Sequence, residues 1–297
     1  MTLRAFSRNL ARATARFRNA SAGEIAAMYW RAARLQFTAS TPSRHIPQPS
    51  IRPERVVISL TTIPARARHI RPALLSLLDQ DEPADRILLN YPVTSLRTGA
   101  PYPDPATLDL PAGIDVLRCT DSGPSTKLLP AIGAEPGALI IVADDDVIYP
   151  SDFVATLLAA HRSEPAPAWG YRGVALNRQA PFAELSHIFA SALDEPQVAD
   201  ILFGTWGYAV TADMFDEGVF NYPGVDDAVR WVDDVWISGH LARRGVPRKI
   251  VASRLFPVES LTVMRQALTS GINRSGENDE IAIAAFGDDW SRPNKAT

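Results

Sequence analysis

The strongest constraint on the fold comes from residues 138–150, which read ALIIVADDDVIYP. The first half is a short apolar run rich in branched residues, typical of a strand that is covered on both faces of a sheet. Three consecutive carboxylates, Asp144, Asp145 and Asp146, follow directly. Side chains alternate along extended chain, so we expect Asp144 and Asp146 to point to one side and Asp145 to the other.

The three aspartates form a candidate metal site. Carboxylates close together at a strand end repel each other and are costly to desolvate. A divalent cation removes that cost, and carboxylate oxygens suit Mn²⁺ or Mg²⁺. Ligands of open α/β sheets bind just beyond the carboxyl ends of the strands. The stretch therefore predicts a metal-dependent site for an anionic ligand, with a nucleotide diphosphate favoured. An acidic turn closed by Pro150 is the alternative that this stretch alone leaves open.

Charge is unevenly distributed along the 297 residues, whose net charge is −3. Residues 1–50 hold eight arginines and one glutamate, which gives +7 and leaves −10 for the remainder. An acidic globular part is a poor general nucleic-acid binder, so no nucleic acid is expected as a partner. Cys119 is the only cysteine, which excludes an intrachain disulfide and a thiolate metal site and fits a reducing compartment. No signal peptide is visible and no run approaches a membrane span of roughly twenty apolar residues, so we expect a cytoplasmic protein.

Composition divides the chain into three segments. Residues 1–38 form a predicted basic, amphipathic, helical extension, because Leu3, Phe6 and Leu10 begin an apolar series at helical spacing among arginines. Residues 1–36 of such a helix can lie on an anionic membrane surface, which would place the protein peripherally at the inner face of the cytoplasmic membrane. A helix docked on the body, a disordered arm and an organelle transit peptide are the alternatives. A Pro-rich linker, 39–54, precedes the globular part, 55–297.

Predicted strands and helices alternate through the globular part. Apolar runs predict strands at 55–62, 86–91, 114–119, 138–143, 169–174 and 206–211. Helical spacing and stop signals predict helices at 70–78, 125–132, 153–158 and 234–244. This alternation predicts an α/β fold with a mostly parallel central sheet flanked by helices.

Three motifs, in order, resemble those of the GT-A glycosyltransferases, and most closely the bacterial family-2-like enzymes. They are the segments 61–64 (TTIP) after the first strand, 144–146 (DDD) and 231–236 (WVDDVW), with 123–127 (GPSTK) between the first two. The resemblance covers roughly residues 55–260 and implies a GT-A, Rossmann-like fold. It also implies transfer of a sugar from a nucleotide diphosphate sugar, with UDP-sugars favoured, to a glycan or lipid-linked acceptor. Bacterial envelope polysaccharide synthesis is the setting that this activity suggests.

The resemblance implies a role for each acidic motif. Asp146 would bind Mn²⁺ or Mg²⁺, and Asp144 would help to hold the nucleotide sugar or its metal, although Asp145 could replace either one. In inverting members an aspartate at the later motif takes a proton from the acceptor hydroxyl, which implies Asp234 as base and Asp233 as its support. A partly buried carboxylate suits this role because its pKa can be raised. Capping of the helix start is the alternative for this pair.

Further residues are expected around the nucleotide sugar. By resemblance, the loop with Thr61, Thr62 and Pro64 contacts the base and ribose, and the turn 204–208 shapes the sugar and acceptor pocket. Arginines nearby can reach phosphate, and a lysine at a helix start lies where anions bind. The candidate contacts are Thr61, Thr62, Pro64, Arg66, Arg68, Lys127, Asp144, Asp145, Gly204, Trp206 and Gly207. A solvated Lys127 and a core Trp206 remain alternatives. The polar tail 273–279, with Arg274, is expected to close over the donor.

Two other functions stay open. A nucleotidyltransferase shares this architecture, but residues 59–64 do not form the Gly-rich basic loop that a triphosphate favours. A catalytically degenerate GT-A domain that serves as a binding or scaffold module at the membrane is the non-enzymatic alternative. The whole interpretation requires residues 144–146 and 233–234 to meet around one cleft.

Overall fold

The computed structural model describes residues 16–37, 52–177, 179–222, 227–261 and 276–291. Its α-helices are α2 (Ala22–Phe37), α3 (Arg71–Leu78), α4 (Leu129–Ala134), α5 (Phe153–Ser163), α6 (Asp233–Arg243) and α7 (Glu277–Phe286). The strands of the large sheet are β1 (Val56–Thr61), β2 (Arg86–Pro92), β3 (Ile114–Cys119), β4 (Leu139–Val142), β6 (Ala168–Gly170), β9 (Gln197–Val198), β11 (Tyr208–Thr211) and β12 (Arg248–Ile250). Smaller sheets contain β7 (Arg172–Val174), β8 (His187–Phe189) and β10 (Ile201–Leu202), and β5 (Val147–Ile148) with β13 (Val258–Glu259). Short 3₁₀ turns that bear on the site include η4 (Ser125–Lys127), η9 (Asp227–Trp231) and η12 (Gly287–Ser291).

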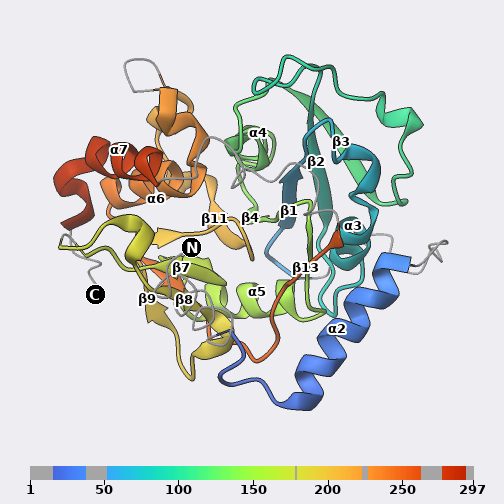
Figure 1. The fold of residues 1–297 in the computed structure, drawn as a ribbon, viewed down its shortest axis with the longest axis horizontal. Helices are drawn as coiled ribbons and strands as arrows, with labels where there is room; N and C mark the ends of the chain where they lie inside the picture. The colour runs from blue at the N-terminus through green and yellow to red at the C-terminus, as the bar shows by residue number, and fades with distance from the viewer. Residues whose placement is uncertain (1–15, 38–51, 178, 223–226, 262–275, 292–297) are drawn as a thin grey trace, which may run out of the picture.

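The large sheet has the strand order β3-β2-β1-β4-β11-β6-β12-β9 in the part of the chain that the structure describes. The pairing directions make six of its eight strands run one way, with β11 and β9 opposed. Helices lie on both sides of this sheet (Figure 1). The predicted α/β fold with a mostly parallel central sheet is therefore confirmed.

Burial explains why the central strands read as uninterrupted apolar runs. Every residue of β4 is buried, and β4 lies between β1 and β11 with helices covering both faces. The edge strand β3, which has a neighbouring strand on one side only, contains half-buried and exposed residues and no fully buried one. Burial therefore places the core at β1 and β4, directly behind the three aspartates.

The predicted strand 169–174 is wrong as one element. The chain bends at the fully buried Tyr171, so β6 joins the large sheet while β7 pairs with β8 and β10. The run 169–174 is apolar or small apart from Arg172, and Gly170 and Gly173, which flank the bend, are its local signal. The predicted helix 125–132 likewise divides into η4 and α4, with Pro130 in the first turn of α4, where its missing N–H costs nothing.

Helix α2 is docked on the body of the protein. It packs on α3, and Met28, Ala32 and Leu35 are its buried residues. The Arg31 guanidinium binds Asp79 through both its carboxylate and its backbone oxygen, the latter at 2.6 Å. Residues 16–21 form turns and bends, not the predicted helix, and residues 1–15 lie outside the described residues. Within the described ranges, no helix combines the length and the apolar character that crossing a membrane requires.

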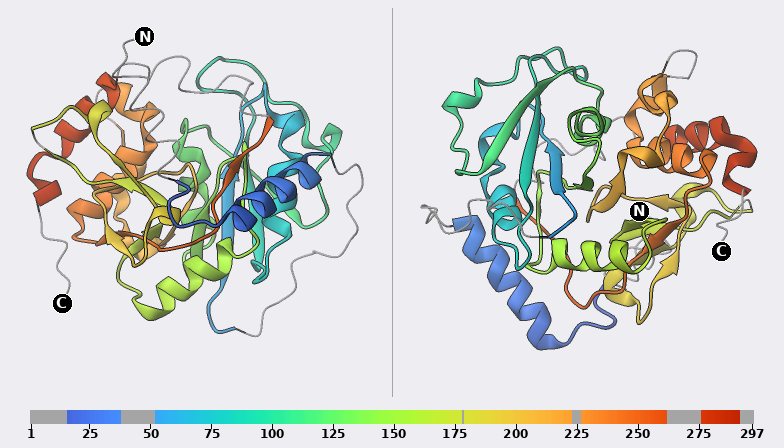
Figure 2. Two further views of the ribbon diagram at one scale, coloured as in Figure 1. Left: turned by 60° about the horizontal axis from the view of Figure 1, so that its bottom comes forward. Right: turned by 180° about the vertical axis from the view of Figure 1, so that it is seen from behind.

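Helix α7 was not predicted, because residues 273–279 were interpreted as a polar tail. Phe286 and Ala282 of α7 are buried against α6, and the Phe286 ring lies 5.5 Å from that of Trp236. Gly239 on α6 leaves the space that the Phe286 ring occupies. The views in Figure 2 place the α6–α7 pair and α2 on opposite sides of the molecule.

Candidate active site

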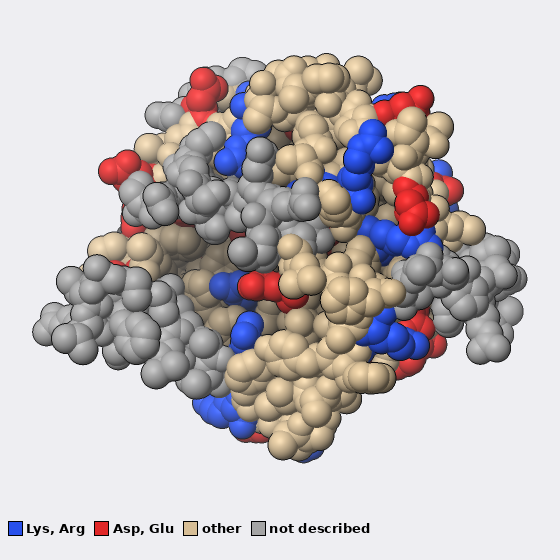
Figure 3. Space-filling view, turned by 45° about the vertical axis from the view of Figure 1, so that its right-hand side comes forward, with Lys and Arg blue, Asp and Glu red and all other residues tan. Residues whose placement is uncertain are grey.

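A cleft of about 450 Å³ opens beyond the carboxyl ends of β1 and β4, where parallel sheets bind their ligands. Both predicted acidic groups, residues 144–146 and 233–234, line it. The remaining lining residues are Thr61, Thr62, Ile63, Arg66, Ser95, Arg97, Tyr102, Asp121, Gly123, Pro124, Lys127, Val147, Arg172, Thr205, Trp231, Val232, Glu259 and Asp279. The face shown in Figure 3 is hollowed, with acidic and basic side chains together inside the hollow.

The three adjacent aspartates all face this cleft. The prediction that Asp145 points away from Asp144 and Asp146 is wrong, because the chain leaves β4 and turns at Asp145 and Asp146. Side-chain alternation holds only for extended chain. The Thr62 hydroxyl donates to Asp145 Oδ2 at 2.5 Å, which ties the turn to the loop after β1.

Arg66 neutralises part of the acidic turn. Its guanidinium Nη1 lies 3.2 Å from Asp145 Oδ1 and also pairs with Asp146. The side chain is only 10% exposed, so water screens these contacts weakly. Arg66 is thus a fixed cation at the cleft wall, as a phosphate contact requires.

Lys127 connects the two acidic groups. Its ammonium Nζ lies 2.8 Å from Asp144 Oδ1 and 3.2 Å from Asp233 Oδ2, and the side chain is 10% exposed. The backbone oxygen of Lys127 accepts hydrogen bonds from Ser59 on β1 at 2.6 Å and Asn90 on β2 at 3.3 Å. The sheet therefore holds this lysine in place, and the alternative of a solvated lysine is wrong.

Asp234 is held by the backbone of a tight turn. The Gly204 N–H donates to Asp234 Oδ1 at 2.7 Å. A Cβ at position 204 would lie 2.4 Å from Lys127 Nζ and 3.3 Å from Asp234 Oδ1, so glycine leaves room for the lysine where it pairs with the aspartates. Val232 is the N-cap of α6 and no side chain caps it, so neither Asp233 nor Asp234 occupies the N-cap.

The same turn stores backbone strain. Trp206 and Gly207 have φ angles of 84° and 86°, and the turn is closed by a 2.8 Å bond from the Gly207 N–H to the Gly204 oxygen. A left-handed conformation is unfavourable for a tryptophan. The Trp206 ring offsets that cost by packing in the core, with its centroid 5.0 Å from that of Phe189. The turn directs Thr205 into the cleft.

Burial and crowding shift the carboxylate pKa values in the cleft. Burial, and then the neighbouring Asp233, raises the pKa of Asp234 to about 8. Burial, followed by Asp145 and Asp144, raises the pKa of Asp146 to about 7. Burial also acts on Asp144, but the Lys127 ammonium outweighs it and lowers the pKa of that carboxyl. The carboxyls of residues 144–146 and 233–234 therefore outnumber Arg66 and Lys127, and burial favours the protonated form of Asp146 and Asp234.

The donor set fits a hard divalent cation. Asp144 and Asp146 offer carboxylate oxygens to the same cleft. Burial, and then Asp145 and Asp144, disfavour the charged form of Asp146, which a bound cation would stabilise. In the ranges that the structure covers, no three His, Cys, Asp or Glu side chains are grouped as a metal site. A cation would be held by these two carboxylates together with diphosphate or water oxygens.

Some predicted contacts do not line the cleft. Pro64, Arg68, Gly204, Trp206 and Gly207 are not among the lining residues. Arg68 is exposed and donates at 3.4 Å to the Thr107 oxygen. Trp206 is 3% exposed, as the core alternative requires. Gly204 and Gly207 act through the shape of their turn, and Arg274 lies outside the described residues.

Sequence reasoning missed several lining residues. The Tyr102 hydroxyl donates at 2.9 Å to the Thr62 oxygen, from a segment that was interpreted as plain loop. The Arg172 guanidinium lies over the Phe189 and Phe203 rings at 5.1 and 5.3 Å. Burial, and then Glu280 and Asp233, raises the pKa of Asp279 to about 6. These residues carry no local motif, and only Asp279 belonged to a segment expected near the donor.

No protein-family model matches this chain, and no curated protein matches it in sequence. Among solved structures, it is similar to the mannosyltransferase PcManGT from Pyrobaculum calidifontis in complex with GDP-Man and Mn²⁺. The TM-score is 0.51 at 18% identity, over 98% of this chain and 77% of that one. TarS from S. aureus aligns at 11% identity in two structures. TarS 1–349 has a TM-score of 0.44 over 80% of this chain and 73% of that one. Its complex with UDP-GlcNAc has a TM-score of 0.49 over 79% of this chain and 72% of that one. The TarS scores are too low to support an argument. The likeness to PcManGT establishes a GT-A-like glycosyltransferase fold.

Replacing Lys127 tests how far it stabilises the site. Lys127→Met leaves buried carboxylates without their cation, so the free energy of unfolding should fall by about 3–5 kcal/mol. Urea unfolding measures this. Lys249→Met is the matched control, because Lys249 pairs with the half-exposed Glu164 at 2.6 Å, and its loss should cost about 1 kcal/mol or less. Equal losses in the two variants would contradict a central role for Lys127.

Proposed function

We propose that this protein is a metal-dependent glycosyltransferase that moves a sugar from a nucleotide diphosphate sugar to a glycan or lipid-linked acceptor. The observation that carries the proposal is the meeting of residues 144–146 and 233–234 in one cleft, on either side of the Lys127 ammonium. One acidic group suits a cation and the other suits a reacting hydroxyl. The GT-A-like fold supports the same activity, and PcManGT binds GDP-Man and Mn²⁺.

The donor would bind at the end of β1 and β4. Asp146 and Asp144 would hold Mn²⁺ or Mg²⁺, which supplies charge stabilisation to the departing diphosphate when it is bound. Arg66 and Lys127 are fixed cations within the same wall and would attract the phosphates. Thr61 and Thr62 line the cleft beside them, where the family resemblance expects the base and ribose. The resemblance favours UDP-sugars as donors.

The acceptor would react beside Asp234. Its raised pKa makes Asp234 a proton acceptor that can work near neutral pH. The acceptor oxygen bonds to the anomeric carbon, the bond from that carbon to the diphosphate oxygen breaks, and the hydroxyl proton passes to Asp234. The Gly204 N–H holds Oδ1 of Asp234, which would leave Oδ2 to take the proton. Asp233 would support the base, and the family resemblance implies inverting chemistry, in which the acceptor attacks opposite the leaving group.

The surface of α2 supports a membrane-linked acceptor in envelope polysaccharide synthesis. Trp30 and Phe37 lie two helical turns apart and are 74% and 77% exposed. Aromatic side chains on an exposed helix face favour the interface of a bilayer. Peripheral binding to anionic lipid would place the protein at the surface that holds a lipid-linked acceptor.

Donor binding tests the core of the proposal. Thermal-shift screening of nucleotide sugars with and without Mn²⁺ should give a metal-dependent stabilisation of about 2.7 kcal/mol at a hundredfold excess over the dissociation constant. Asp146→Ala should abolish the metal dependence, whereas Asp115→Ala, an exposed site on β3, should keep it. Binding that survives both EDTA and Asp146→Ala would contradict the metal-dependent mechanism, and pyrophosphate release from a nucleoside triphosphate would favour a nucleotidyltransferase.

The base is tested separately from donor binding. Asp234→Asn keeps an oxygen for the Gly204 N–H but loses the proton acceptor, so the transfer rate should fall by about 10²–10⁴-fold. Single-turnover transfer measures the rate, and the thermal shift with donor should match that of the unchanged protein. A transfer rate within a few-fold of the original would exclude Asp234 as the base.

Membrane binding is tested with vesicles. The double variant Trp30→Ser, Phe37→Ser should sediment about tenfold less with phosphatidylglycerol vesicles, because it loses buried aromatic area. Phe220→Ser, at a side chain that is 44% exposed away from α2, is the control and should behave as the original protein. Equal sedimentation of all three proteins would remove α2 from the membrane proposal.

A further inference from the structure

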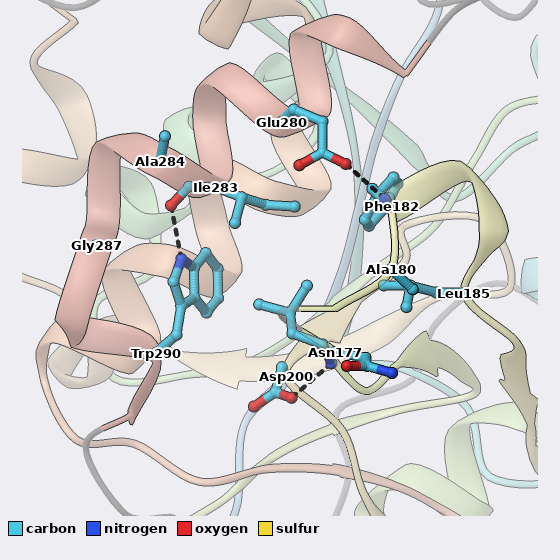
Figure 4. Close-up of a pocket in the computed structure, with 11 residues that line it drawn as sticks. Asn177, Ala180, Phe182, Leu185, Asp200, Glu280, Ile283, Ala284, Gly287 and Trp290 are labelled. Atoms are coloured by element: carbon cyan, nitrogen blue, oxygen red, sulfur yellow. Dashed lines mark hydrogen bonds between the residues drawn. The ribbon is translucent and has the colours of Figure 1, made fainter.

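A second pocket, of about 290 Å³, lies beside the cleft, between α7 and a wall that includes Leu176, Asn177, Ala180, Phe182 and Leu185. Figure 4 shows Trp290 and Ile283 on one side and Phe182 and Glu280 on another, with Asn177 and Asp200 below them. The volume is near the lower end of the range for small-molecule sites. The proposed transfer chemistry does not use this pocket.

Its lining combines apolar surface with fixed polar groups. The Trp290 Nε1–H donates to the Ile283 oxygen at 2.9 Å, which holds the indole ring in the pocket wall. Asp200 Oδ2 accepts from the Leu176 N–H at 2.8 Å, and Glu280 Oε1 accepts from the Phe182 N–H at 2.6 Å. Each carboxylate keeps capacity to accept further hydrogen bonds. A ligand with one C–H face and several hydroxyl donors matches such a lining, and a pyranose ring has both.

The charged residues that line the pocket limit the class of sugar that fits it. Two carboxylates and the Asn177 amide are the polar lining, and no lysine or arginine of the described chain lines the pocket. Arg248 lies 3.6 Å from Asp200 Oδ1 but is 2% exposed and sits behind the wall. The two carboxylates that line the pocket favour a neutral or an amino sugar over one that carries a phosphate or uronate group.

The pocket shares a wall with the cleft. Two consecutive residues of α7 line different cavities: Asp279 lines the cleft and Glu280 lines the pocket. The Phe182 ring, in the pocket, lies 6.4 Å from the Phe203 ring, over which the cleft residue Arg172 is placed. The pocket is therefore a neighbour of the cleft in which Asp234 lies.

We infer that this pocket binds a neutral or amino sugar unit of the acceptor glycan, distinct from the unit that reacts. The inference rests on the proposed function for its physiological meaning. Binding of sugar to the pocket is nevertheless measurable without donor, metal or turnover.

The test fills the pocket without disturbing the core. Ala284 lines the pocket and is exposed, so Ala284→Phe blocks it at little cost to folding. Ala285→Phe is the matched control, one residue along the same helix, exposed and outside the pocket lining. Saturation-transfer NMR and calorimetry of the full chain use three probes: cellotriose, a glucosamine trimer and a galacturonate trimer.

We expect cellotriose or the glucosamine trimer to bind the original protein and Ala285→Phe alike, and Ala284→Phe at least about tenfold more weakly. The galacturonate trimer should not bind. Failure of both the neutral and the amino trimer to bind, or binding that Ala284→Phe leaves unchanged, would overturn the inference. Thermal shifts with nucleotide sugar and Mn²⁺ on the same variants report on the cleft separately, so loss of the proposed function and loss of the pocket give different results.

Discussion

The ion pairs of the buried Lys127 ammonium with Asp144 and Asp233 are the contact on which the site depends. They join the end of β4 to the start of α6, two segments that are far apart in the sequence. Without a cation between them, two buried carboxylates would repel each other in a medium that screens charge poorly. The sheet itself fixes the lysine, since Ser59 and Asn90 bind its backbone oxygen.

Burial and neighbouring carboxylates disfavour the charged forms of Asp146 and Asp234, and the proposed chemistry uses this property. Burial and mutual repulsion raise the pKa of Asp146 to about 7 and that of Asp234 to about 8. A folded protein holds such groups at a cost in stability, which packing elsewhere must offset. A bound cation would stabilise the charged form of Asp146. A proton taken from a hydroxyl would convert Asp234 to its favoured neutral form.

The earlier and the later segments of the globular part supply different residues to the cleft. Strands β1 to β4 and their loops supply Thr62, Arg66 and the three aspartates to one wall of the cleft. The later segments supply Thr205, Asp234 and Asp279 to the other. Helix α7 contributes to both the cleft and the second pocket, because Asp279 and Glu280 face different spaces from adjacent positions.

The sequence by itself determined the parallel sheet, the strands that lead to Thr62 and Asp144, and the two acidic groups as candidate site residues. Buried strands and carboxylates at strand ends leave local patterns from which these features can be predicted. It did not determine the turn that brings Asp145 into the cleft, the bend at Tyr171, the docking of α2 through Arg31, or helix α7. Only the tertiary structure decided these, since each depends on partners distant in the sequence: Thr62 and Arg66 for the turn, Asp79 for the docked helix, and the space above Gly239 for Phe286. Local patterns record the environment of a residue's own segment, whereas a site is defined by which segments meet.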